Sequence, residues 1–194
     1  MKKTIQISDL PDSELLRKEL KRENYHRRFI LAMKSTFFTL IVVAAIAVLV
    51  ATVWMPVLQI YGTSMAPTLN EGEIVIAVKG STFESGDLVS FYIGNKLLVK
   101  RYIAGPGQWV EIDQAGNVFV NGQPLDEPYL TEKSLGDCDI EFPYQVPDNR
   151  IFCMGDHRAT SLDSRNTAVG CISEEQIVGK IVFRVWPFAV FGGV

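Results

Sequence analysis

The sequence is poor in the side chains that most often bind metals or act as general bases. It holds two histidines, His26 and His157, and its three cysteines form no CxxC pair. Because no histidine stands at ligand spacing from a cysteine, we expect no zinc site and no other metal. Outside the cytoplasm, one disulfide and one free thiol are possible, and the pairing among the three stays open. The cysteines are Cys138, Cys153 and Cys171.

The sequence also lacks charged residues between positions 36 and 55, which read TFFTLIVVAAIAVLVATVWM. A helix of about 20 residues, rising about 1.5 Å each, crosses the ~30 Å hydrocarbon core of a bilayer. A core helix of a soluble protein is usually shorter and has a polar face, and a cleaved secretory signal has an apolar core of roughly 7–15 residues behind a short leader. We therefore predict an uncleaved transmembrane helix over 36–55.

Basic residues gather before this stretch. Residues 1–35 hold nine Lys and Arg against five Asp and Glu, whereas the rest of the chain holds ten against 17. Positive charge stays on the cytoplasmic side, so we predict a cytoplasmic N-terminus, a single pass through the cell membrane, and an extracytoplasmic domain over 56–194. The acidic balance of that domain argues against a nucleic-acid partner.

The segment over 1–35 is expected to be partly helical. Asp12 or Ser13 suits a helix cap, Leu15, Leu16 and Leu20 recur near helical spacing, and the segment as far as Arg28 is basic and amphipathic. Two interpretations stay open: the helix is solvated and only sets the topology, or it lies on the anionic inner leaflet.

After the apolar stretch, helical periodicity gives way to short β-rich runs separated by Gly and Pro clusters. Many short strands at this spacing predict a mainly β, barrel-like domain. About 139 residues are enough to close one core. The predicted strands are Val57–Tyr61, Glu73–Val78, Asp87–Ile93, Lys96–Ile103, Trp109–Ile112, Asn117–Val120, Ile140–Val146, Arg150–Met154 and Ile177–Trp186.

Ser64 is a candidate nucleophile. A serine ahead of Pro67 is more often a turn or cap residue, so the assignment depends on finding a base for its hydroxyl. The usual base is histidine, and a triad of Ser64, His157 and Asp163 is conceivable but has no spacing signature.

Lys100 offers a different base. A lysine at its reference pKa of about 10.4 is neutral in about one molecule per thousand near pH 7.5. Burial lowers that pKa, and strand alternation places Leu98 and Tyr102 on the same face as Lys100. The alternative is an ordinary edge-strand lysine that reaches water beside Arg101.

Several motifs occur in order along the chain. They are Ser64-Met65-Ala66-Pro67-Thr68-Leu69, Gly86-Asp87-Leu88-Val89, Lys100-Arg101-Tyr102-Ile103-Ala104-Gly105-Pro106-Gly107, Gly155-Asp156-His157-Arg158 and Ser161-Leu162-Asp163-Ser164-Arg165. In this order they resemble the successive conserved boxes of the bacterial type I signal peptidases, in a short form with one anchor like that of Gram-positive bacteria. The resemblance covers most of residues 60–187.

The resemblance implies a role for each matching residue. Ser64 corresponds to the nucleophile and Lys100 to the general base, while Ser161 corresponds to the hydroxyl that orients the lysine amine. Asp163 and Arg165 correspond to a charged pair that supports the loop of the site. Arg101 and Asp156 can join the same network, and as surface pairs they would contribute little.

The chain departs from the family pattern at two positions. Gly62 stands where Gram-negative members often carry a hydroxyl that donates to the oxyanion, so the oxyanion hole must rely on the backbone N–H of Ser64, with or without another donor. His157 stands where asparagine is common, which leaves its role open.

The implied function is that of a membrane-bound serine endopeptidase that removes signal peptides from exported preproteins after small residues. An extended substrate would add as a strand beside Ile60, Tyr61 and Gly62, and no cofactor is required. Two alternatives remain: a self-cleaving Ser/Lys regulator like the SOS-response repressors, which the apolar stretch disfavours, and a membrane-anchored β module that binds peptides without cleaving them.

Overall fold

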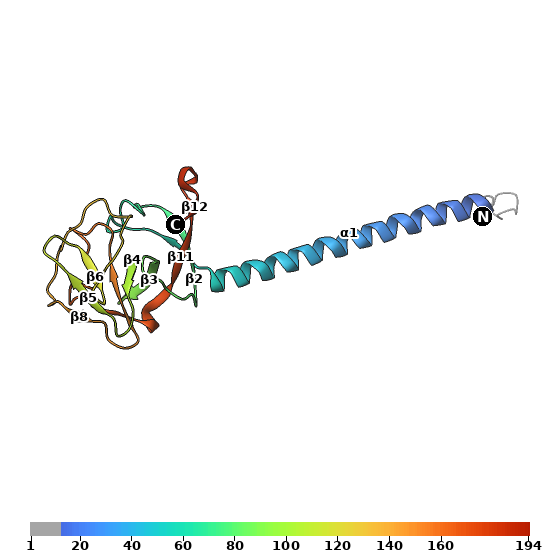
Figure 1. Cartoon of the computed structure of the whole chain (residues 1–194). Coiled ribbons are helices and arrows are strands. Elements are labelled where there is room, and N and C mark those ends of the chain that lie inside the picture. The colour runs from blue at the N-terminus through green and yellow to red at the C-terminus, as the bar shows by residue number, and fades with distance from the viewer. Residues whose placement is uncertain (1–12) are drawn as a thin grey trace. The chain divides into compact units, whose positions relative to one another are not determined.

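The structure, a computed structural model, describes residues 13–194 (Figure 1). Residues 1–12 of the predicted cytoplasmic segment, including the predicted cap Asp12, lie outside the described part. The chain divides between Val50 and Ala51 into two compact units.

One long helix accounts for the N-terminal unit. Helix α1 runs without a break over Ser13–Trp54, so the predicted amphipathic segment continues directly into the apolar stretch. Its 42 residues correspond to about 63 Å of helix. None of its side chains is buried, and among residues 13–194 it is the one helix long and apolar enough to cross a membrane.

The second unit is mainly β, as predicted, and its two sheets are antiparallel. Within the described residues the larger sheet has eight strands. In order of pairing they are β1 (Val57–Gln59), β2 (Ile74–Val78), β11 (Ile177–Trp186), β3 (Leu88–Ile93), β4 (Lys96–Ala104), β9 (Arg150–Met154) and β10 (Ile172–Ser173), while β12 (Gly192–Gly193) pairs with β11.

The smaller sheet has four strands in the described part of the chain, and it comes from the middle of the sequence. Its order is β7 (Gln123–Pro124), β6 (Val118–Val120), β5 (Trp109–Ile112) and β8 (Tyr144–Gln145). Two short 3₁₀ helices, η2 (Glu174–Gln176) and η3 (Phe188–Val190), flank β11.

Each predicted strand overlaps an observed strand, but the agreement is uneven. The run Ile140–Val146 forms a strand only at Tyr144–Gln145, because Phe142 is followed by Pro143, which has no N–H to donate to a ladder. The prediction missed β7, β10 and β12, each of two residues, which are too short to show alternation.

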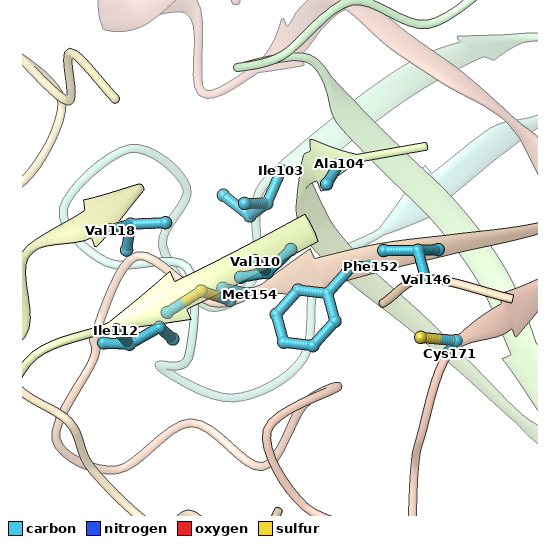
Figure 2. Packing of buried hydrophobic residues seen from close by; sticks show 9 residues of the cluster. All are labelled: Ile103, Ala104, Val110, Ile112, Val118, Val146, Phe152, Met154 and Cys171. Carbon is cyan, nitrogen blue, oxygen red and sulfur yellow. The ribbon is translucent and has the colours of Figure 1, made fainter. Parts of the chain in front are cut away.

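A core cluster joins the two sheets. Phe152 and Met154 of β9 point towards Val110 and Ile112 of β5, and together with their neighbours they exclude water (Figure 2). The cluster members are Ile103, Ala104, Val110, Ile112, Val118, Val146, Phe152, Met154 and Cys171. Because β4 and β9 contribute side chains to this close-packed core, the packing restrains both strands and the residues that adjoin them.

Candidate active site

Ser64 lies on the loop that connects β1 and β2, and its side chain is half-buried. The loop is fixed by the apolar side chains that follow: Met65 and Leu69 are buried in a core cluster with Leu58 and Val75. The loop also carries Thr68, whose hydroxyl donates to the Asp156 carboxylate at 2.5 Å. A nucleophile on such a loop keeps its position, because both apolar packing and a buried polar contact restrain the backbone.

Lys100 lies in the middle of β4, and strand alternation places its neighbours as expected. Leu98 lines the same cavity as Lys100, whereas Leu97 and Val99 pack against the core cluster of the Ser64 loop. The Lys100 side chain is only 3% exposed. Burial lowers its pKa to about 8, and the negative charge of Asp163 offsets part of that effect.

Ser64 and Lys100 line one cavity of about 360 Å³. Apart from Lys96, its other walls are apolar: Ile93, Leu98, Leu162, Ala168 and Val169. Ser64 also lines a second hollow, together with residues 59–62, Met65 and residues 97–99. The serine therefore lies where two hollows meet, in surroundings that favour an uncharged amine over an ammonium ion.

A chain of polar contacts leads from the lysine to a buried ion pair. The Lys100 Nζ donates to Ser161 Oγ at 2.9 Å. Asp163 accepts from Arg165 Nε and Nη2, both at 2.8 Å, and the side chains of this pair are 0% exposed. Burial alone would raise the pKa of Asp163, but the hydrogen bond and charge of Arg165 hold it below its ordinary value. Asp163 therefore stays ionised beside the amine.

The turn over 155–158 connects the two halves of the site. The His157 N–H donates to the Ser64 carbonyl at 3.0 Å, and the Gly155 N–H donates to Asp163 Oδ2 at 2.9 Å. A Cβ on residue 155 would overlap the Ser161 side chain and stand 2.6 Å from the Ser64 carbonyl oxygen. Only glycine allows the three segments to approach this closely.

The histidine triad considered from the sequence does not match this arrangement. The His157 side chain is exposed, and its Nδ1 pairs with Thr160 Oγ1 at 2.9 Å. The Asp163 carboxylate is engaged by Arg165 and Gly155. The structure thus brings Ser64 together with Lys100 and Ser161, and it leaves the imidazole in solvent.

The ion pair of Arg101 and Asp156 lies inside the protein, so its interpretation as a weak surface pair is wrong. Arg101 donates from Nε and Nη2 to the two Asp156 oxygens at 2.8 and 2.6 Å. The two side chains are 8% and 0% exposed. A buried, two-pronged pair of this kind is geometrically demanding, and loss of one partner is costly.

The predicted substrate-binding residues line the second hollow. Ile60 is buried, whereas Tyr61 is 76% exposed. Ile60 still pairs with the chain near Glu73, but within the described residues the backbone groups of Tyr61 and Gly62 have no protein partner. Opposite them, β4 pairs with β9 only from Arg101 onward, so residues 97–99 also present a free strand edge.

Two residues that contact the arginines of the site were missed from the sequence: one ion-pair partner and one aromatic ring. Glu127 forms a pair with Arg158 in which both side chains are 0% exposed, and the ring of Tyr129 lies 3.7 Å from the Arg101 guanidinium carbon. Neither residue belongs to a recognisable motif. The one available signal, an acidic residue between Asp126 and Pro128 in a loop, is too common to single out.

Metal ligands and thiols are the remaining groups that could carry chemistry. Among residues 13–194, no three His, Cys, Asp or Glu side chains gather in a group that would hold a metal ion. All three cysteines are free thiols, and burial raises the pKa of Cys153 well above its usual value. A thiol kept neutral in this way is a packing residue rather than a nucleophile.

The mainly β fold and the cavity shared by a serine hydroxyl and a buried lysine point to the class of serine peptidases. Comparison with known proteins identifies the family. Residues 33–186 match the family described as "Signal peptidase, peptidase S26". The chain is 40% identical over 153 residues to signal peptidase IB of Staphylococcus aureus, covering 68% of this chain and 78% of that protein.

A plant relative is also similar. Thylakoidal processing peptidase 1 from the chloroplast of Arabidopsis thaliana is 36% identical over 146 residues, which is 66% of this chain and 41% of that protein. A crystal structure of a signal peptidase I from Enterococcus faecalis aligns with 52% of this chain and 97% of its own, at 23% identity and a TM-score of 0.42.

The chain therefore belongs to the signal peptidase S26 family, and it is a serine peptidase. The resemblance to bacterial type I signal peptidases that the motifs suggested is confirmed.

Proposed function

We propose that the protein is a membrane-anchored endopeptidase that removes signal peptides from exported preproteins, with Ser64 as nucleophile and Lys100 as general base. One observation carries the assignment: Lys100 is only 3% exposed, has its pKa lowered to about 8, and lines the same cavity as Ser64. At neutral pH about one Lys100 in ten is then uncharged and able to accept a proton.

The reaction is acyl transfer. The Ser64 oxygen attacks the scissile carbonyl while its proton passes to Lys100 Nζ, and the same proton then goes to the leaving amine as the C–N bond breaks. Water next attacks the ester, giving one proton to Lys100, which returns it to Ser64 as the acid leaves. Ser161 is the positioning residue, because its Oγ accepts from Nζ at 2.9 Å and directs the amine.

The oxyanion of the tetrahedral intermediate needs at least one hydrogen-bond donor. Within the described residues the Ser64 backbone N–H has no protein partner, so it is free to donate. Gly62 has no side chain to help, and a donor of this kind contributes up to about 3–4 kcal/mol to transition-state stabilisation. The Ser64 N–H is therefore our candidate donor.

Substrate binding follows from the two free strand edges. An extended peptide that enters between Tyr61–Gly62 and residues 97–99 would find backbone partners on both sides. The hollow that Ser64 shares with residues 59–62 has a volume of only about 30 Å³, and the walls of the cavity that Ser64 shares with Lys100 are mainly apolar. Such surroundings suit small side chains near the cleaved bond, as in an Ala-x-Ala pattern.

The proposed location completes the function. Residues 36–55 cross the cell membrane with the N-terminus in the cytoplasm and residues 56–194 outside, because the basic residues precede the apolar stretch. Signal peptides of preproteins occupy the same bilayer, so enzyme and substrate share one membrane.

A cleavage assay tests the assignment. The full-length chain in detergent is compared with Ser64→Ala, Lys100→Ala and His157→Ala on one preprotein that carries an Ala-x-Ala site. We expect Ser64→Ala and Lys100→Ala to lose at least about 10³-fold in kcat, because the nucleophile or its base is missing. We expect His157→Ala to stay within a few-fold of wild type, because its imidazole faces solvent.

The matched lysine control is Lys180→Ala. Lys180 pairs with Asp87 on the surface, and its loss should leave cleavage unchanged. Full turnover by Lys100→Ala would reject the Ser/Lys assignment, and inactivity of His157→Ala would favour the triad. If wild type binds the preprotein without cleaving it, and a penem-type acylating probe fails to label Ser64, the chain is a peptide-binding module instead.

A further inference from the structure

The segment over 125–130 contacts the active-site support without touching the serine or the lysine. It follows β7 and is anchored to the core, since Leu125 packs against the cluster that joins the two sheets and its N–H donates to the Val118 carbonyl. The Leu130 N–H closes the segment by donating to the Glu127 carbonyl. Its central side chains are therefore presented from a fixed backbone.

Two of those side chains engage two arginines. Glu127 accepts from Arg158 Nη2 at 2.5 Å in a fully buried pair. The Tyr129 hydroxyl donates to Glu127 Oε1 at 3.1 Å, while the Tyr129 ring lies 3.7 Å from the Arg101 guanidinium carbon. One tyrosine thus connects the ion pair of Arg158 with the guanidinium of Arg101.

The same two arginines fix the conformation of the 155–158 turn, of which Arg158 is the last residue. Arg158 Nε donates to the Gly155 carbonyl at 3.0 Å, and Arg101 clamps the Asp156 carboxylate. This turn donates to the Ser64 carbonyl on one side and to Asp163 on the other. The distance between Ser64 and the lysine-supporting residues therefore depends on where the two arginines place the turn.

We infer that Glu127 and Tyr129 are positioning residues for the acyl transfer: they fix Arg158 and Arg101, and through them the turn that holds Ser64 against its base. The inference rests on the proposed function. Tyr129 acts as a neutral donor, because burial and the charge of Glu127 raise its pKa. Misplacement of a reacting group by about 1 Å can cost 100-fold in rate, so a contact two residues removed from the chemistry is able to control it.

The test separates positioning from loss of folded protein. A penem-type probe counts the active sites in detergent-solubilised full-length chain, and cleavage of an Ala-x-Ala preprotein is then expressed per labelled site. For Glu127→Gln and Tyr129→Leu we expect the rate per site to fall about ten-fold or more, with the pH profile still rising through about 8, because the surroundings of Lys100 are intact. Tyr129→Phe keeps the ring against Arg101 and should lose only about two- to three-fold.

The control is Lys180→Ala, which breaks a partly exposed ion pair with Asp87 and should keep the wild-type rate per site. The inference is overturned if Glu127→Gln and Tyr129→Leu yield fewer labelled sites that each work at the wild-type rate. If Glu127→Gln fails to fold, Tyr129→Leu and Tyr129→Phe decide the question alone. A wild-type chain that does not cleave would overturn the proposed function as well, whereas an active wild type with unaffected variants overturns this inference only.

Discussion

Burial of the Lys100 side chain changes the protonation behaviour of its amine. The amine has almost no exposed surface, and the loss of hydration lowers its pKa to about 8 even though Asp163 is nearby. Ser161 Oγ accepts from the amine, while the ionised Asp163 carboxylate is bonded to its own cation, Arg165. The lysine is therefore flanked by polar groups that do not restore its positive charge.

The lowered pKa predicts the pH dependence of catalysis. The base must be neutral, so kcat/KM should rise about ten-fold per pH unit below about 8 and level off above it. The measurement is kcat/KM on a preprotein between about pH 6 and 10 for wild type and His157→Ala. The two profiles should coincide, whereas a profile that levels off above about pH 6.5 and changes on loss of His157 would indicate a histidine base.

The ion pair of Arg101 and Asp156 marks the limit of reasoning about single residues. Both were recognised as charged residues near the site, but their burial was not, because a charge pattern in sequence looks the same on a surface and in an interior. The burial of the pair depends on tertiary contacts such as the hydrogen bond from Thr68 to Asp156, which are 88 positions apart in the chain.

Among the structural elements, the 155–158 turn has the largest influence on the site. Its Gly155 carbonyl accepts from the Arg158 side chain and its Asp156 carboxylate accepts from Arg101. Its backbone N–H groups donate to the Ser64 carbonyl and to Asp163. Its conformation is possible because position 155 has no Cβ.

Gly155→Ala tests this close approach. The added methyl group must displace the Ser64 carbonyl or Ser161, so we expect kcat to fall about 100-fold while the β domain stays folded. Cleavage per labelled site and the thermal midpoint are measured together. Gly193→Ala serves as the matched control, because its Cβ would meet only the Val182 carbonyl oxygen at 3.9 Å. Wild-type turnover by Gly155→Ala would show that the turn tolerates displacement.

Strand β4 was the most predictable element of the site. Period-two alternation placed Leu98 and Lys100 on one face, as observed, because side-chain direction along a strand is a local property. Strand pairing in the smaller sheet was less predictable. The stretch Ile140–Val146 was expected to be a strand, but only Tyr144–Gln145 pairs with β5 and the rest is loop, since pairing depends on a neighbour that the local pattern does not reveal.

For the molecule as a whole, the proposed membrane anchor is the feature with the widest consequence. The apolar side chains of α1 are all exposed, and the helix is long and apolar enough to cross a bilayer.

Replacing Val43 and Ile46 together by arginine tests the anchor. Each arginine near the centre of a membrane helix costs about 2.5–3.5 kcal/mol on the insertion scale, so the double variant should be largely released from membranes by alkaline washing. Wild type and the double leucine variant should stay in the membrane pellet. Equal retention of all three would mean that α1 does not span the bilayer.

Local chemistry alone was sufficient for the apolar stretch, the strand alternation and the order of the conserved boxes, because each depends on residues close together in the chain. The tertiary structure decided which of these residues meet. Lys100 and Ser161 are 61 positions apart, and Arg158 and Glu127 are 31 apart. The pKa of a lysine and the strength of an ion pair depend on what surrounds them in space. Both are therefore set only when the tertiary fold brings distant segments together around the same cavity.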